Sequence, residues 1–567
     1  MKRLLLFLFL LLFAIQTIPY LNDGRRFHPD EAFFMTFARH AAIGGDWWLQ
    51  GSLDKPPLTI YANALMIATI GADTLPDGVL ILDPIKGEFV GRLFSFFCGL
   101  VLVAVTMRLA LDLSKHTLVA LIGGVVLATL PMMHLYSASA FMDMPMVVLA
   151  MAALLVAVRR KAGMSGILLA LAFAAKPQAV FFAPLVVWFV INPIAKGNLI
   201  PNPSPHGEGS YNPSPQWRRG RGEVVLRNTA NVQSILRFGM ALSIGLALLF
   251  LWDALRLGDS VFALGATNNN FFAPTLNFET IVQRTRNWLP YPTNAPVWFN
   301  LLTGISLFVG LFVGRVRVFC AWILIYLIGH VILFDTLYMR YLLPIVPILI
   351  IVNIYFISSI LSLAFPPSKP KNANRLQLFA KRFLLIFVIL YSTNFWSEQI
   401  RKYTIAFESN NYEVSNIIVF EDYQRKLPEP FNELANYLNA KPVATVIYDH
   451  WLGWSLKYYM GEWHDKRIVY YPLPQEMVAD ALVLQETGTR YFVAPRGNFS
   501  NYGLSSSYSE SVEQWLEAFR QAGFVVTLEK TIEGIEVYAI NSKNIFPKVK
   551  TLGYPENAHT MCVSSFF

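Results

Sequence analysis

Two short polar motifs lie between the first two long apolar runs of the sequence. They are His28-Pro29-Asp30-Glu31 and Asp54-Lys55-Pro56-Pro57-Leu58. An acidic pair, and a carboxylate beside a lysine, are poorly suited to a helix that faces lipid, because charges in hydrocarbon are costly and are retained mainly for function. The same residue types suit a reaction at a membrane surface, where a carboxylate acts as a base and a cation stabilises an anionic leaving group.

The composition places most of the chain in a membrane. Its 567 residues are 54% hydrophobic and 15% charged, with a mean hydropathy of +0.43, whereas soluble domains carry roughly 25% charged residues. The formal net charge is +9, but the bases form short runs between apolar segments, which is typical of cytoplasmic loops and argues against nucleic acid as a partner. Cys98, Cys320 and Cys562 show neither a disulfide framework nor metal-ligand spacing.

Apolar runs long enough to cross a bilayer recur up to about residue 400, since a membrane helix needs about 20 residues. Leu4–Tyr20 follows Lys2-Arg3 and precedes no small-residue cleavage site, which predicts an uncleaved first span with a cytoplasmic N-terminus. The later predicted spans are 92–113, 118–137, 145–158, the short pair 167–175 and 181–191, 235–255, 297–313, 318–334, 341–363 and 383–396. That makes about eleven spans with basic inward ends, so the C-terminal region is expected outside.

Two stretches lack the membrane pattern. Residues 196–233 are rich in proline, glycine and arginine, which favours a disordered cytoplasmic insertion over a lipid-headgroup contact. Residues 401–567 have a globular composition, which predicts a small α/β domain on the external face. Its predicted strands are 443–448, 490–494, 524–528 and 534–540, and its predicted helices are 452–459, 477–486 and 511–522. Within it, Asp449-His450 follows a strand, and a polar pair in a strand-end turn is favoured over a catalytic pair.

The charged residues at the external span ends share one character. On this topology carboxylates and cations occur together on the external side, whereas the cytoplasmic ends carry mostly Lys and Arg. The external set is Asp30, Glu31, Asp54, Lys55, Asp143, Lys176, Asp335 and Arg340. Such a mixture suits a reaction whose nucleophile needs a base and whose leaving group is anionic.

The order of the polar motifs resembles a known family. The motifs are Pro29-Asp30-Glu31, Gly45-Asp46-Trp47-Trp48, Asp54-Lys55-Pro56-Pro57-Leu58, Met142-Asp143-Met144-Pro145, Ala174-Ala175-Lys176-Pro177 and Arg340-Tyr341-Leu342-Leu343-Pro344. Together they resemble the landmarks of the GT-C glycosyltransferases, which include the protein O-mannosyltransferases and the bacterial aminoarabinose transferases of lipid A. The resemblance extends over about residues 1–400.

The resemblance implies a mostly α, polytopic GT-C bundle with interfacial helices in the first external loop, residues 21–90, and an external α/β domain, residues 401–567. It further implies an inverting hexosyl- or pentosyltransferase in the bacterial inner (plasma) membrane. The sugar is expected to pass from a polyprenyl-phosphate donor in the bilayer to a protein or glycolipid acceptor at the external face.

Three carboxylates receive roles from the resemblance. Asp30 is expected to be the general base that takes the proton of the acceptor hydroxyl, with Glu31 orienting Asp30 or the sugar. Asp54 is the candidate ligand for a divalent metal ion, the one cofactor implied. The structural alternative for Asp30 is an N-cap of the helix that begins near Glu31, since Pro-Asp is a good helix start signal.

Five further residues receive roles in binding the polyprenyl-phosphate sugar donor. Lys55, Arg340 and Tyr341 are expected to bind the lipid phosphate, and Asp143 and Lys176 to position the substrate. The structural alternatives are a snorkelling Lys55, an interfacial anchor at Arg340-Tyr341 and a helix start at Asp143. Relatives often place Arg or Tyr shortly after the acidic pair, whereas this chain has Phe33 and Phe34.

Two other functions are alternatives to glycosyl transfer. A transporter or flippase predicts inverted repeats and charges at mid-membrane, whereas no repeat is evident and the charges lie at the outer interface. A non-catalytic receptor that acts through its C-terminal domain leaves the polar first loop unexplained. Glycosyl transfer from a lipid-linked donor is therefore the function that the sequence favours.

Overall fold

The computed structural model of the chain describes residues 2–22, 26–114, 117–192, 217–256, 258–268, 273–288, 297–313, 316–334, 339–364, 430–461, 466–483, 490–496, 511–532 and 534–542. The chain divides into two compact units. The helical unit comprises Met1–Leu21, Ser52–Ala62 and Arg92–Phe420. The sheet unit comprises Asn22–Gly51, Asn63–Gly91 and Glu421–Phe567.

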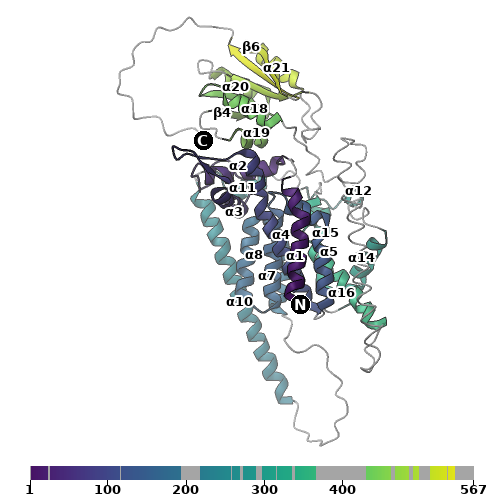
Figure 1. Ribbon diagram of the computed structural model, residues 1–567. Helices are drawn as coiled ribbons and strands as arrows, with labels where there is room; N and C mark the ends of the chain where they lie inside the picture. Colours follow the sequence, from purple (N-terminus) through teal and green to yellow (C-terminus); the bar gives the residue numbers. More distant parts are fainter. Residues whose placement is uncertain are drawn as a thin grey trace, which may run out of the picture. The chain divides into compact units, whose positions relative to one another are not determined.

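The helical unit is built from helices that run largely side by side (Figure 1). The helices are α1 (Lys2–Leu21), α3 (Leu58–Met66), α4 (Pro84–Ser114), α5 (Thr117–Ala128), α6 (Pro131–Ser137), α7 (Asp143–Val158), α8 (Ala162–Ala175), α9 (Ala183–Ile191), α10 (Trp217–Leu255), α11 (Val261–Thr267), α12 (Phe278–Trp288), α14 (Val297–Gly310), α15 (Arg317–Leu333) and α16 (Val346–Ala364), with 3-10 turns η2 (Pro177–Phe182) and η3 (Met339–Leu342). The ends of α3 and α4 extend into the sheet unit.

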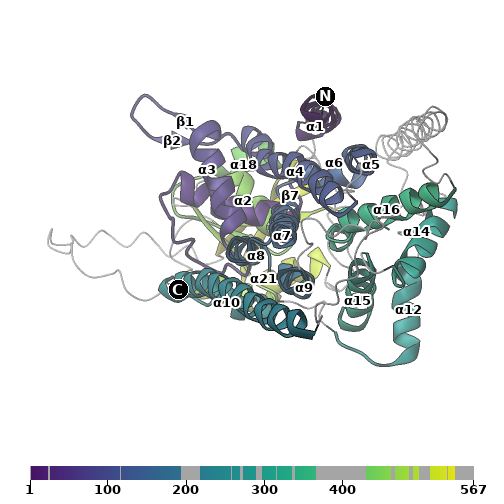
Figure 2. The same ribbon diagram turned by 90° about the horizontal axis from the view of Figure 1, so that it is seen from below.

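Helix α7 forms the centre of this unit because it is apolar on all sides and buried along most of its length. It packs against α8 and α9, and α8 in turn packs against α10 (Figure 2). Small residues permit the close approach of α8 and α10: a Cβ on Gly166 would lie 2.9 Å from the backbone nitrogen of Leu242. Glycine at such contacts is typical of helices that pack within a membrane.

Among the described residues, three helices are long and apolar enough to cross a bilayer, within Leu4–Leu21, Pro84–Ser114 and Asn231–Leu255. Shorter apolar helices cover Leu58–Gly71, Asp143–Val158, Ala162–Ala175, Pro177–Ile191, Arg317–Leu333 and Val346–Phe356. Most predicted spans therefore coincide with apolar helices, while the predicted span 383–396 lies outside the described residues.

The predicted disordered insertion, residues 196–233, differs from the structure in its second half. Residues 193–216 lie outside the description, but α10 begins at Trp217, so residues 217–233 are helical instead. The physical reason is cooperativity: once the apolar span has formed a helix, each added residue gains a hydrogen bond without a new nucleation cost. The chain has no proline between Pro215 and the end of α10 at Leu255 to stop that extension.

The sheet unit contains a five-stranded mixed sheet in the order β4-β3-β5-β7-β6. Strand β3 (Thr445–Asp449) lies parallel to β4 (Lys466–Tyr470) and β5 (Arg490–Pro495), while β7 (Ile535–Ser542) lies antiparallel to β5 and β6 (Phe524–Ile532). The helices are α18 (Pro430–Asn439), α19 (Gly453–Met460), α20 (Pro474–Val483) and α21 (Val512–Gln521). The predicted C-terminal α/β fold is therefore present, although β4 and α18 were not predicted.

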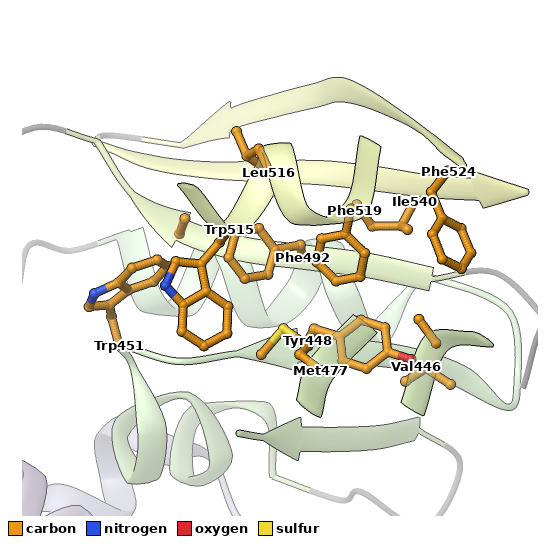
Figure 3. Packing of buried hydrophobic residues seen from close by; sticks show 12 residues of the cluster. Val446, Tyr448, Trp451, Met477, Phe492, Trp515, Leu516, Phe519, Phe524 and Ile540 are labelled. Carbon is orange, nitrogen blue, oxygen red and sulfur yellow. The ribbon is translucent and has the colours of Figure 1, made fainter. Parts of the chain in front are cut away.

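The core of the sheet unit is aromatic. Helix α21 directs Trp515, Leu516 and Phe519 toward the sheet, where Phe492 and Tyr448 meet them (Figure 3). The rings of Phe492 and Trp515 are stacked with centroids 6.1 Å apart. Large buried rings of this kind supply much of the hydrophobic stabilisation in so small a domain.

The N-terminal part of the sheet unit comes from the first loop. It contains α2 (Pro29–Ala42), the π-helical turn η1 (Ile67–Gly71) and a short antiparallel pair, β1 (Asp73–Thr74) and β2 (Leu80–Ile81). Helix α2 packs against α19, so a segment near residue 35 and a segment near residue 456 form one packed layer. Helix α2 lies within the first loop, residues 21–90, where helices were expected.

Candidate active site

Asp54 and Lys55 form an ion pair just before α3. Lys55 Nζ donates to Asp54 Oδ2 at 2.8 Å, and the lysine side chain is 36% exposed. Asp54 Oδ1 is buried without a hydrogen-bond partner among the described residues. Helix α11 covers the backbone here, since a Cβ on Gly265 would lie 2.8 Å from the Asp54 carbonyl oxygen. The pair therefore holds a partly exposed ammonium group beside a fixed carboxylate.

Asp143 and Lys176 form a second pair that joins the start of α7 to the end of α8. Lys176 Nζ donates to Asp143 Oδ1 at 2.6 Å, and the Asp143 side chain is almost fully buried. Pro177 explains the geometry, because a residue before proline is driven out of the helical region, and Lys176 is extended at φ −158°. Asp143 also occupies the first turn of α7, where a negative charge is favourable. The two roles expected for Asp143 are thus compatible.

Arg340 and Tyr341 lie in the 3-10 turn η3, and aromatic rings surround the cations there. Arg340 Cζ lies 4.8 Å from the ring centroid of Phe141 and 5.8 Å from that of Tyr341. Lys176 Nζ lies 4.9 Å from the Tyr341 ring centroid. A cation over an aromatic face is attracted by the ring quadrupole, so Tyr341 helps to hold both cations in place.

The motifs of the helical unit therefore converge on one region. Arg340 and Lys55 both lie near enough to Lys176 to repel its charge. Lys55 pairs with Asp54, Lys176 pairs with Asp143, and Arg340 adds a third cation beside the Tyr341 ring. Such a cluster suits an anion with several oxygen atoms, such as a phosphate.

A buried hydrogen-bond network supports this cluster, and no sequence motif predicted it. Gln178 Nε2 lies 3.0 Å from Tyr326 Oη and 3.2 Å from His330 Nε2, and Tyr326 Oη donates to the Tyr341 carbonyl at 2.6 Å. His330 Nδ1 faces the Tyr326 carbonyl at 2.9 Å, so Nδ1 carries the proton and Nε2 accepts from Gln178. The Gln178 amide is thereby oriented, and its Oε1 is buried without a partner among the described residues. Only the proximity of Gln178 to Lys176 could have indicated it.

Asp30 and Glu31 belong to the sheet unit, at the N-terminus of α2. The structural alternative, in which Asp30 caps this helix, is not found, because His28 and Glu31 form the cap. His28 Nδ1 accepts from the Asp30 backbone nitrogen at 3.1 Å, and Glu31 Oε2 accepts from the His28 backbone nitrogen at 2.8 Å. The Asp30 side chain is 46% exposed, with its Oδ2 4.0 Å from His28 Nδ1. The helix thus presents a carboxylate that it does not use for its own cap.

The residues present do not fit a metal site made by the protein alone. Within the described part of the chain, no group of three or more His, Cys, Asp or Glu side chains could hold a metal ion. Two carboxylates lie near the cations, but Lys55 Nζ donates to Asp54 Oδ2 and Lys176 Nζ donates to Asp143 Oδ1. A divalent ion at Asp54 would have to take its other ligands from a phosphate and water, as Mg²⁺ often does.

Comparison of the sequence with models of known protein families found no match, and neither did comparison with curated proteins. Comparison with solved structures did. The crystal structure of ArnT from Cupriavidus metallidurans bound to undecaprenyl phosphate is similar with a TM-score of 0.54 at 13% identity, covering 94% of this chain and 97% of ArnT. The apo form of that ArnT gives a TM-score of 0.51 at 12% identity, with 93% and 97% covered.

A third structure, the S. cerevisiae protein O-mannosyltransferase Pmt1-Pmt2 complex bound to the sugar donor, gives a TM-score of 0.30 at 16% identity. It covers 48% of this chain and 36% of that chain, so the assignment of the fold depends on the two ArnT structures. The fold that the motifs predicted is confirmed by these two structures and by the apolar helices. The chain is an integral membrane protein with the GT-C fold of ArnT.

Proposed function

We propose that this protein is an inverting glycosyltransferase that moves a sugar from a polyprenyl-phosphate donor to an acceptor hydroxyl. The observation that carries the proposal is the cluster of Lys55, Lys176 and Arg340 in a chain whose fold matches ArnT over nearly its full length. One of those ArnT structures contains undecaprenyl phosphate. Three cations beside apolar helices support a lipid phosphate as the ligand.

The cations bind and stabilise the phosphate of the donor. Arg340 offers a planar pair of donors that suits two phosphate oxygens, and Lys55 is exposed enough to reach a ligand. Lys176 is held by Asp143 and by the Tyr341 ring. When the bond between the anomeric carbon and the phosphate oxygen breaks, negative charge develops on that oxygen, and fixed cations stabilise it without reorganisation.

Asp30 acts as the general base. The acceptor oxygen attacks the anomeric carbon from the face opposite the phosphate, its proton passes to an Asp30 carboxylate oxygen, and the lipid phosphate leaves with the bonding electrons. This single displacement inverts the anomeric centre. Glu31 acts indirectly, because its carboxylate fixes the start of α2 and hence the direction of Asp30.

The proposed orientation follows from the charges at the span ends. The protein lies in the bacterial inner (plasma) membrane with its N-terminus on the cytoplasmic side. The first loop and the C-terminal domain lie on the external side. The acceptor is a protein or a glycolipid. A divalent ion, where one takes part, binds at Asp54, and no step of the proposed reaction depends on it.

The test is mass spectrometry of the glycolipids and glycoproteins from a strain that lacks this protein. We expect one sugar to disappear from the envelope fraction, to return with the wild-type chain, and to stay absent with Asp30→Asn at equal protein abundance. An unchanged sugar inventory in the deletion strain, or full restoration by Asp30→Asn, would overturn the proposal.

A further inference from the structure

We infer that Tyr458 and Tyr459 of α19 are positioning residues for the reaction, because they clamp the helix that carries Asp30. This inference rests on the proposed function for its catalytic meaning. Its structural basis is independent, since all the contacts described below lie within the sheet unit. It assigns a task to the C-terminal domain, for which the proposed chemistry gives none.

Tyr459 holds the start of α2. Its hydroxyl accepts from the Phe27 backbone nitrogen at 3.1 Å and donates to Glu88 Oε1 in a close hydrogen bond. Glu88 Oε2 in turn accepts from Arg26 Nη1 at 3.0 Å. Burial and the neighbouring Glu88 raise the pKa of Tyr459 well above its ordinary value, so the hydroxyl stays protonated as this donor. The clamp therefore acts directly before His28, which caps the catalytic helix.

Tyr458 holds two further points of the first loop. Its hydroxyl donates to the Pro84 carbonyl at 3.0 Å, where α4 begins, and its own carbonyl accepts from Arg39 Nη1 at 3.3 Å near the end of α2. Two glycines make room for these contacts: a Cβ on Gly87 would collide with the Tyr458 hydroxyl, and a Cβ on Gly461 would collide with the Arg39 guanidinium.

The middle of α2 is held by Trp454, one turn earlier on α19. Its ring centroid lies 4.5 Å from that of Phe33 and 5.6 Å from that of Phe37. These contacts give Phe33 and Phe37 a structural role in holding α2 against α19. Helix α19 thus contacts the catalytic helix near its start, its middle and its end.

The clamp has a catalytic consequence because a base must be held within a fraction of an ångström of its productive position. A misplacement of 1 Å can cost roughly 100-fold in rate. Loss of the Tyr459 hydroxyl would also leave the buried Glu88 carboxylate with one hydrogen-bond partner fewer, so the Arg26–Phe27 segment would shift. The proposed phosphate ligands belong to the helical unit, so the affinity for a lipid phosphate should not follow the loss in rate.

The experiment compares Tyr459→Phe with Tyr448→Phe in the full-length protein in nanodiscs. Tyr448 is a matched control, because it is buried in the same domain and its hydroxyl also bonds a carboxylate, that of Asp480 at 2.9 Å. We expect kcat for sugar transfer to fall about 10- to 100-fold in Tyr459→Phe, with the Kd for undecaprenyl phosphate unchanged. We expect Tyr448→Phe to keep the wild-type kcat.

Amide hydrogen exchange separates this inference from the proposed function. We expect Tyr459→Phe, but not Tyr448→Phe, to lose protection at Phe27 and along α2. Unchanged protection, or an equal loss of kcat in both variants, would overturn the clamp. A wild-type chain that transfers no sugar, while the exchange result is as expected, would overturn the proposed function and leave the clamp standing.

Discussion

The ammonium nitrogen of Lys176 has two roles, one in the stability of the fold and one in the proposed binding of phosphate. The ammonium group neutralises Asp143, which is buried at the start of α7, and it also lies over the Tyr341 ring in the cationic cluster. Removing one partner of a buried ion pair destabilises a protein, because the other partner remains as a buried charge without a counter-charge. The proposed phosphate site is therefore rigid before any ligand arrives.

This double role predicts the outcome of a mutant cycle. We expect Lys176→Met to lower the free energy of unfolding by about 3–5 kcal/mol, since it leaves the Asp143 carboxylate buried alone, and to weaken undecaprenyl phosphate binding. Adding Asp143→Asn should recover most of the stability but not the binding. Thermal unfolding and lipid-binding titrations measure the two effects, and recovery of binding in the double variant would contradict a phosphate role for Lys176.

Gln178 offers a second prediction at this scale. Its amide donates to both Tyr326 and His330, so Gln178→Leu leaves two buried acceptors without that donor. We expect a loss of about 1–3 kcal/mol in the free energy of unfolding, with an altered environment of the His330 ring in NMR spectra. The control is Gln178→Glu, which keeps the shape but removes the donor. A Leu variant as stable as the wild type would contradict the network.

The sequence predicted the charged residues of the site better than their local partners. The order of motifs indicated Asp54, Lys55, Asp143, Lys176 and Arg340, and the structure brings these five together. It did not indicate that His28 would cap α2, because histidine is not among the preferred cap residues. Nor could it reveal Gln178 or Tyr459, whose contacts join segments more than a hundred residues apart.

At the scale of elements, β3 and α19 are joined by a buried carboxylate. Asp449 accepts from the backbone nitrogens of Trp451, Leu452 and Gly453, at 3.1, 2.8 and 2.5 Å, in the turn between them. The interpretation of Asp449 as a strand-end turn residue thus fits the structure. Burial raises the pKa of Asp449 to about 6, although the three N–H donors oppose that change.

The raised pKa of Asp449 predicts a pH-dependent stability. Between its unfolded value of 3.8 and about 6 the folded state binds the proton more tightly, so this stabilisation is fully present below pH 4 and is lost as pH rises through 6. The loss amounts to about 3 kcal/mol at most. Unfolding of the full chain followed by fluorescence should show this slope, and Asp449→Asn should remove it. An identical slope in both proteins would contradict the assignment.

The close contact between α8 and α10 predicts that a larger side chain at Gly166 disturbs their packing. Gly166 lies against the backbone of α10, so Gly166→Val should separate the helices and lower the unfolding temperature in detergent. Gly239 is the control, since it lies in α10 itself and a Cβ there meets nothing within 4 Å. Equal unfolding temperatures for Gly166→Val and Gly239→Ala would contradict the packing.

Helices and strands could be predicted where the hydrophobic periodicity and the length of the segment both indicated the same element. The predicted helix 511–522 corresponds to α21, with Ser511 as its cap. Strand β4 escaped prediction because its apolar run is short and two cations begin it. Helix α18 carried an amphipathic pattern that could have indicated it, with Phe431, Leu434 and Leu438 buried on one face.

At the scale of the whole molecule, the fold was predictable because the polar motifs and the apolar runs constrain it independently. Apolar runs predicted the spans, and the motif order predicted the GT-C bundle that the ArnT structures share. The division into units was less accessible, since the structure joins residues 22–51 and 63–91 to the C-terminal domain. That joining depends on aromatic and tyrosine contacts between distant segments, which leave no periodic pattern in the sequence.

Metal removal gives a prediction at this scale. Because the described residues offer two carboxylates beside the cations, each already paired with a lysine, and not a ligand cluster, we expect EDTA to change the rate of sugar transfer by less than about twofold. Cations alone can neutralise the leaving phosphate. Loss of transfer with EDTA that Mg²⁺ restores in the wild type, but not in Asp54→Asn, would instead assign a metal to Asp54.

The most direct test of the account measures Asp30→Asn in proteoliposomes made with lipid-linked sugars extracted from the native membrane. We expect transfer to fall about 10²- to 10⁴-fold, the usual contribution of a general base, while the Kd for undecaprenyl phosphate stays within about twofold of wild type. Transfer that persists at more than a tenth of the wild-type rate in Asp30→Asn would contradict the account.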